Sequence, residues 1–300
     1  MSLNLITKPF KRRVPEPSTA LHGLQDIDIV EVRDLDGHYV GFLADASRAQ
    51  ATMLSRVTDA ATVTPDALGM WEASLVGMES LLATVSTLTV AEDEPSWSLS
   101  ATMQAVGRDE RRDPTELATR LATSAPAIYR QAGDSGFHSR PLSSSEVVSF
   151  GQLHWSPLHP ASWPPRAAIV EEGPSEVTVD GNTHVVFEVT CDGDGTVLEM
   201  LASIIQDLGP RVDATFRLAR VFRPAAGLDK TSSGRRVGLL TISYEAGRRD
   251  TGTYLAALCL AQLDARARLR VRRLFGRQQL GMGMALGLGV LGWQHLEVIL

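Results

Sequence analysis

Cysteine and aromatic residues are scarce in this chain of 300 residues, and its charge is weakly acidic. The two cysteines, Cys191 and Cys259, lie far apart and match no spacing used by zinc or redox sites, so we expect reduced thiols and a cytoplasmic protein. No apolar run follows the basic residues between Lys8 and Arg13, so a secretory signal is not predicted. The formal net charge of -6 gives no electrostatic reason to expect nucleic acid as a partner.

Long apolar segments without glycine are also missing. The longest uncharged run lies between Arg277 and Glu297, and glycine interrupts it repeatedly. A membrane span would need about 20 mostly apolar residues, so this run is long enough on paper. The glycines instead favour a helical turn followed by a buried central strand with close backbone packing. No clear transmembrane helix is therefore predicted.

Motifs for nucleotide, metal or nucleophile chemistry are incomplete. Lys230-Thr231 is the nearest fragment of a phosphate-binding loop, but the second glycine of that motif is absent. The serine clusters at residues 143–145 and 232–233 lack the G-x-S-x-G turn that exposes a catalytic serine. The sequence therefore predicts no catalytic residue, no cofactor and no metal site.

Hairpin and helix signals are clear in the first half of the chain. Glycine turns and apolar runs predict hairpins, and a cap residue followed by proline and an acid predicts each long helix. The predicted elements are strands at 29–33 and 39–43, a helix at 65–76, strands at 81–90 and 97–106, a helix at 114–133, and a short helix begun by Ser143 and Glu146.

A similar series follows a proline-rich bridge. Strands are predicted at 177–179, 185–189, 214–222 and 236–244, with helices at 196–208 and 251–265. The predicted organisation is a flexible lead-in (1–25), a first α/β half (26–155), the bridge (156–175) and a second α/β half (176–300). The fold class is α/β, with mixed β-sheets, packed helices and two pseudo-repeated hairpin–helix–strand–strand–helix units.

Arginine alternates with aliphatic residues near the end of the second half. Arg266, Arg268, Arg270 and Arg272 would share one face of a strand, because side chains on a strand alternate between its two faces. Such a face could contact an acidic partner or anionic lipid head groups. These four arginines are the predicted partner-binding residues.

Several short motifs, in this order, resemble the cytoplasmic domain of EccE, a component of the actinobacterial type VII (ESX) secretion membrane complex. The similar stretches are residues 32–40 around the D-G-H turn, 64–89, the helix from 114 with the G-x-x-x-R strand at 136–140, the helix start at 143–146, and 274–278 with 285–289. Two features depart from the family: its two N-terminal transmembrane helices are absent, and Gly287 replaces its closing proline.

The resemblance implies a non-catalytic scaffold subunit in protein export. Its implied partners are other secretion-complex subunits, including an FtsK-type ATPase assembly. Without the family's transmembrane helices, we expect peripheral association with the inner face of the cell membrane through those partners.

Two other functions remain open from the sequence. One is a conjugation-type secretion assembly protein. The other is a small-molecule or sugar-modifying α/β enzyme that draws on Asp36, His38, Asp180 and His184 at two equivalent hairpin turns. Convergence of these turns in one pocket would favour the enzyme.

Overall fold

The secondary structure comes from a computed structural model that describes residue 24 and residues 27–78, 80–92, 95–157, 160–191, 196–224, 234–247 and 251–289. The strands are β1 (Ile27–Arg33), β2 (Tyr39–Asp45), β3 (Gln50–Val57), β4 (Leu81–Val90), β5 (Ser96–Gln104), β6 (Ser139–Pro141), β7 (Val170–Glu172), β8 (Val177–Val179), β9 (Asn182–Thr190), β10 (Thr215–Arg223), β11 (Arg235–Glu245) and β12 (Val271–Arg273). The helices are α1 (Pro65–Leu75), α2 (Pro114–Asp134), α3 (Ser144–Trp155), α4 (Thr196–Leu208), α5 (Thr251–Ala261), α6 (Ala265–Arg268) and α7 (Gln278–Ala285).

All of these strands belong to one antiparallel sheet, and the predicted α/β fold class is confirmed. The strand order is β1-β2-β3-β5-β4-β10-β11-β9-β8-β7, with β6 paired to β3 and β12 paired to β9. The two halves meet where β4 pairs with β10, and Thr87 lies opposite Ala219 in that register. One sheet therefore runs through both halves of the chain.

The strand order repeats about the β4–β10 junction. Reading outward from it, β4-β5-β3-β2-β1 in the first half matches β10-β11-β9-β8-β7 in the second. The side strands match as well, because β6 pairs with β3 and β12 pairs with β9. The predicted pair of α/β units is thus present as two copies of one topology, related by a pseudo-two-fold axis at the junction.

Helix starts follow the local signals in the sequence. Thr64 accepts the Ala67 N–H at 3.1 Å to cap α1, and Asp113 accepts the Thr115 N–H at 2.8 Å to cap α2. Ser143 and Glu146 form a capping box at the start of α3. Each cap pairs an N–H group that has no partner within the helix, which is why these starts were predictable.

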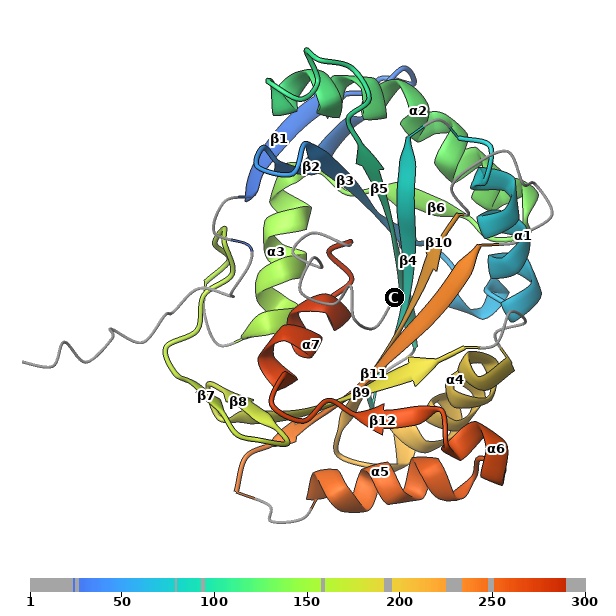
Figure 1. Cartoon of the computed structure of the whole chain (residues 1–300), viewed down its shortest axis with the longest axis vertical. Helices are drawn as coiled ribbons and strands as arrows, with labels where there is room; N and C mark the ends of the chain where they lie inside the picture. The colour runs from blue at the N-terminus through green and yellow to red at the C-terminus, as the bar shows by residue number, and fades with distance from the viewer. Residues whose placement is uncertain are drawn as a thin grey trace, which may run out of the picture.

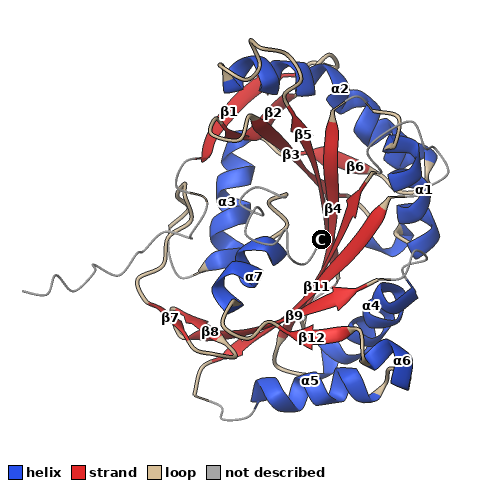
Figure 2. Cartoon of the chain, viewed as in Figure 1, coloured by secondary structure: helices blue, strands red, loops and turns tan. Residues whose placement is uncertain are grey.

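The sheet is strongly curved and carries helices on both faces. Figure 1 shows α1, α2, α4, α5 and α6 along the convex side, while α3 and α7 lie within the concave side. Figure 2 shows the strands as one continuous bent layer around α3 and α7. The buried apolar residues form two clusters that match these layers: Trp71, Leu121, Leu201 and Leu255 belong to the convex cluster, and Trp155 and Met282 to the concave one.

Helix α3 begins against the first half and ends against the second. At its start the Ser144 N–H donates to Glu31 of β1 at 3.1 Å. At its end, Arg217 of β10 lies 3.0 Å from His154 Nδ1, and the Ser156 hydroxyl donates to Asp180 at 2.6 Å. Helix α3 therefore ties the two halves together across the junction.

The region of helix α7 contacts both halves in the same way, starting from the second half. The Gln279 N–H donates to Glu172 of β7 at 3.0 Å, which repeats the contact between α3 and Glu31. Beyond its last turn, Gly287 packs on Thr87 of β4, and Gly289 packs on Thr52 of β3. In each half, the C-terminal end of one helix or the residues just after it contact the other half.

Close packing at the start of α3 depends on Gly41 of β2. A Cβ atom at this position would lie 2.7 Å from the Ser144 backbone, and the Gly41 N–H donates to the Leu142 carbonyl at 2.8 Å. We expect Gly41→Ala to lower the free energy of unfolding by about 1–3 kcal/mol, because backbone atoms cannot yield as a side chain can. Urea unfolding of the two proteins measures the difference.

Gly69→Ala is the matched control for this substitution. Gly69 lies inside α1 with nothing within 4 Å of the position where a Cβ would be. Alanine should stabilise that helix by up to about 1 kcal/mol. Equal effects of the two substitutions would contradict the close packing at Gly41.

The sequence-based prediction missed β3 and assigned part of the C-terminal region wrongly. Most of β3 is buried, because helices cover both faces of the sheet there, so no polar alternation marks it as a strand. The predicted helical turn near Arg277 is α7, but residues 286–289 form no strand, and residues from 290 onward lie outside the described residues. Among the described helices, none combines the length and apolarity that crossing a bilayer requires.

Candidate functional site

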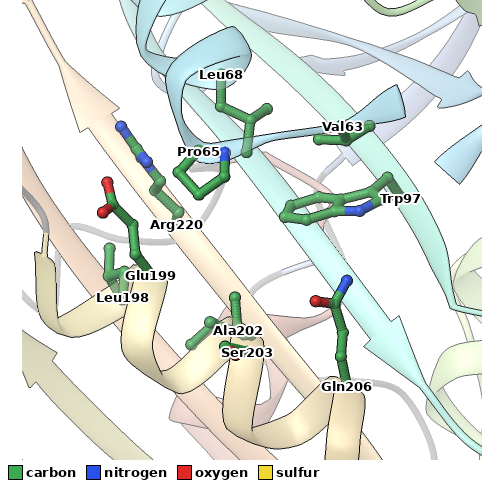
Figure 3. Close-up of a pocket in the computed structure, with 11 residues that line it drawn as sticks. Val63, Pro65, Leu68, Trp97, Leu198, Glu199, Ala202, Ser203, Gln206 and Arg220 are labelled. Carbon is green, nitrogen blue, oxygen red and sulfur yellow. The ribbon is translucent and has the colours of Figure 1, made fainter. Parts of the chain in front are cut away.

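A cleft on the convex side separates the helices of the two halves. It opens between α1 and α4 over strands β5 and β10 and encloses about 640 Å³, including space open to solvent. Figure 3 shows Val63, Pro65 and Leu68 on one side and the exposed face of α4 on the other. The cleft lies beside the β4–β10 junction, so its two walls come from different halves of the chain.

The α4 wall is a second face of an amphipathic helix. Leu198, Leu201 and Ile205 fill the core, while Glu199, Ala202, Ser203 and Gln206 line the cleft at helical spacing. Ala202 and Ser203 are small, so the middle of this wall is shallow. The wall therefore has small side chains at its centre and longer polar side chains at its two ends.

The opposite wall is mainly apolar. Val63 and Pro65 flank the Thr64 cap of α1, and Leu68 lies one turn further on. Trp97 of β5 closes one end of the cleft, and Figure 3 shows the Gln206 side chain directed toward it. The Trp97 Nε1 group is buried and has no hydrogen-bond partner among the described residues.

Charged residues beneath the cleft balance one another in part. Glu72 of α1 is fully buried, and its carboxylate lies 2.8 Å from Arg220 Nε and 2.9 Å from Arg236 Nε. Arg220 Nη2 also donates to Glu72 at 2.8 Å. Because burial without a partner would be costly, these three side chains form a structural ion-pair cluster, of which Arg220 reaches the cleft.

Chemically, the cleft suits binding through shape and a few polar groups. Apolar walls supply contact area, and Glu199, Ser203 and Gln206 supply polar groups along α4. Glu199 is half-buried and forms no hydrogen bond or ion pair with any described residue. Apolar walls with a few directed polar groups are the usual character of a recognition site.

The four predicted arginines do not lie on one strand. Arg266 and Arg268 belong to the short helix α6, Arg270 follows it, and Arg272 lies on β12. The strand interpretation is wrong here because Asp264 caps α6, accepting the Ala267 N–H at 2.7 Å.

The exposed arginines of this segment therefore lie on two different elements, α6 and β12. Arg266, Arg268 and Arg272 are exposed. Arg268 Nη2 also donates to the Leu263 carbonyl at 3.0 Å and so helps to end α5. Arg266 therefore lies on α6 and Arg272 on β12, and both remain exposed.

The predicted enzyme residues are not brought together. Tyr129 donates to Asp34 at 2.7 Å and to Asp36 at 3.1 Å, which ties the β1–β2 turn to α2. Asp180, between β8 and β9, accepts the Ser156 hydroxyl and the Ile169 N–H. No described contact joins the two turns, which lie toward opposite ends of the strand order. They are also not equivalent, since β1–β2 corresponds to β7–β8.

A cluster of buried polar side chains on the concave face includes two histidines. His184 Nδ1 lies 2.8 Å from the Ser243 hydroxyl, and His154 Nδ1 lies 3.0 Å from Arg217 Nη2. Burial, with the charge of Arg217 second, lowers the pKa of His184 to about 3 and holds the pKa of His154 well below its usual value. Burial also lowers the pKa of Arg217 to about 10. Both histidines are therefore neutral at neutral pH.

Both cysteines are free thiols, and burial raises the pKa of each to about 11. Within the described part of the chain, no three His, Cys, Asp or Glu side chains are placed to hold a metal ion. The fold is that of an α/β protein of internally repeated topology, with a cleft beside the junction of its two halves. No protein-family model and no curated protein sequence matches the chain.

Proposed function

We propose that this protein is a non-catalytic structural subunit of a type VII secretion membrane complex, acting in protein export in actinobacteria. The observation that best supports a binding role is the cleft between α1 and α4, whose mainly apolar lining carries a few polar side chains along α4. The EccE-like motifs supply the link to secretion. In this proposal the protein is held at the inner membrane face by other subunits, including an FtsK-type ATPase assembly.

The exposed arginines are a second contact surface in this proposal. Arg266 and Arg272 lie on α6 and β12, where both side chains are exposed. A guanidinium can form bidentate hydrogen bonds with a carboxylate, so an acidic subunit surface would be a suitable partner. The enzyme alternative has less support, because its four proposed residues are not brought together.

Affinity purification of the tagged full-length chain from its native host, after gentle solubilisation of membranes, tests the proposal. We expect secretion-complex subunits, including the ATPase, to co-purify, and the double variant Arg266→Glu with Arg272→Glu to reduce their recovery about 10-fold or more. That loss corresponds to about 1.4 kcal/mol of binding free energy. Recovery of conjugation-type subunits instead would support the conjugation alternative.

The control variant is Arg111→Glu with Arg112→Glu. These arginines are exposed in the loop before α2, and the substitutions change the net charge equally. Subunit recovery should match the original protein. A purified protein without secretion subunits would contradict the proposed function. Equal losses of subunits in both variants would show that the loss follows from the change in net charge and not from contacts of Arg266 and Arg272.

A further inference from the structure

A second cavity lies in the first half and shares no lining residue with the cleft between α1 and α4. The β1–β2 turn, α2, β6 and the start of α3 surround it, and it encloses about 880 Å³, including space open to solvent. Binding sites for small molecules usually enclose about 300–1,000 Å³. The size of this cavity therefore suits a small ligand.

Aromatic rings are concentrated in the lining of this cavity. The chain has four tyrosines, and two of them, Tyr39 and Tyr129, line it together with the ring of His38. Tyr39 is 61% exposed, so its ring is available for contact. The rings of His38 and Tyr129 lie edge to face, with their centroids 6.4 Å apart. These rings offer apolar surfaces against which the face of a ligand ring can pack.

Contacts with residues outside the lining hold these rings in place. Asp34, whose side chain is fully buried, accepts the His38 N–H at 2.8 Å and the Tyr129 hydroxyl at 2.7 Å. The Arg33 guanidinium lies 5.7 Å from the centroid of the Tyr39 ring, a cation–π contact. Because the rings are already positioned, a ligand would spend little free energy on ordering them.

His38 presents a ring nitrogen that is free to accept a hydrogen bond. Its Nδ1 atom lies 3.4 Å from the Asp34 carboxylate, and an ionised carboxylate only accepts hydrogen bonds, so this contact places a proton on Nδ1. In the neutral ring Nε2 is then an acceptor, and it has no hydrogen-bond partner among the described residues. The His38 side chain is 61% exposed, so a ligand hydroxyl can reach it.

The charged side chains of the lining favour an uncharged ligand. Arg140 and Glu146 form two hydrogen bonds, of 2.6 Å and 3.1 Å, and so neutralise each other. Apart from these two and His38, no lining residue has an ionisable side chain other than tyrosine. Both signs of charge also occur just outside the lining, at Arg33 and at the aspartates of the β1–β2 turn. An ionic ligand would therefore find no unpaired opposite charge in the lining.

The Arg140–Glu146 pair is also accessible to a ligand. Its two side chains are 48% and 37% exposed, so their N–H groups and carboxylate oxygens can still form hydrogen bonds with a ligand. Glu146 is held in place by the Ser143 N–H, which donates to it at 2.9 Å. The lining thus combines aromatic rings with several fixed polar groups.

We propose that this cavity binds a neutral sugar, with a C–H face of the sugar ring against Tyr39 and a sugar hydroxyl donating to His38 Nε2. A sugar ring has apolar C–H faces and hydroxyl groups around its edge, so it can use both the aromatic rings and the Arg140–Glu146 pair. A flat aromatic ligand would use the rings alone. This inference does not depend on the proposed subunit role, because it needs only the residues around this cavity.

Saturation-transfer NMR with the purified full-length protein tests the proposal. The probes are the methyl glycosides of glucose, galactose, mannose and N-acetylglucosamine, with adenosine as a comparison ligand that carries a flat ring. We expect transfer to at least one glycoside, strongest at the C–H protons of one face of the sugar ring. Absence of transfer to every glycoside, or transfer to adenosine alone, would overturn the proposal.

Substitutions locate the binding in the cavity. Tyr39→Ala and His38→Ala should each weaken binding of the glycoside at least about 10-fold, whereas Tyr39→Phe should retain it because the ring remains. Tyr254→Ala is the matched control, since Tyr254 on α5 is also 61% exposed and does not line the cavity. Thermal unfolding checks that each variant is folded. Unchanged binding in both Tyr39→Ala and His38→Ala, or an equal loss in Tyr254→Ala, would overturn the proposal.

Discussion

Glu72→Leu is expected to lower the free energy of unfolding by about 3–5 kcal/mol, enough to unfold a large part of the protein at 37 °C. Glu72 is 1% exposed, and its carboxylate forms ion pairs with both Arg220 and Arg236. Leucine is close in size, so the loss comes mainly from leaving two guanidinium groups without this carboxylate. Urea unfolding followed by circular dichroism measures it.

A compensated variant distinguishes lost charge pairing from poor packing. Combining Glu72→Leu with Arg220→Met and Arg236→Met removes all three charges and retains apolar volume. We expect this triple variant to recover most of the stability lost by Glu72→Leu. A Glu72→Leu loss below about 1 kcal/mol would show that the cluster is not a structural ion pair.

Acidification from pH 6.5 to pH 5 is expected to lower the free energy of unfolding by about 2 kcal/mol through His184 alone. Its folded pKa is about 3, below the ordinary value of 6.5, so the unfolded chain binds the proton first. Stability from this group is therefore present above pH 6.5 and is lost as pH falls toward 3, by about 1.4 kcal/mol per pH unit. His154 acts in the same direction.

His184→Asn should reduce this pH dependence, because asparagine keeps a polar group beside Ser243 and does not titrate. The measurement is the urea midpoint and slope at several pH values between 5 and 7.5. The control is His138→Asn, whose side chain lies on the surface. An unchanged pH dependence in His184→Asn would contradict the buried neutral histidine.

Local elements were predictable where a few neighbouring residues decide the conformation. The Thr64 and Asp113 caps, the capping box at Ser143 and the glycine turn at Gly37 all act within four residues of themselves. Strand β3 was missed for the opposite reason. Its burial on both faces depends on helices from distant parts of the chain, so its own sequence carries no alternation.

The arginine segment shows how one pattern can suit two structures. Alternation of arginine with aliphatic residues predicted a strand, but Asp264 caps a helical turn and Arg268 contacts the end of α5. Those contacts involve residues just outside the alternating pattern. The strand prediction ignored them and therefore placed Arg266 and Arg268 incorrectly.

The cleft could not be predicted from either half alone. Its lining combines α1, β5, α4 and β10, which become neighbours only because β4 pairs with β10. One signal was present: Glu199, Ala202, Ser203 and Gln206 form a second stripe on α4, beside its apolar face. A polar face is also the usual pattern of a helix on the protein surface, so this stripe alone does not mark α4 as the wall of a cleft.

The reciprocal crossing of α3 and α7 has a mechanical consequence for the cleft on the opposite face. The start of α3 contacts Glu31 and the residue after its end contacts Asp180, while the start of α7 contacts Glu172 and Gly287 beyond its end packs on Thr87. The halves therefore cannot hinge apart without breaking contacts at both crossings. We therefore expect the spacing of α1 and α4 to change little on binding, so that binding there spends little free energy on reshaping the protein.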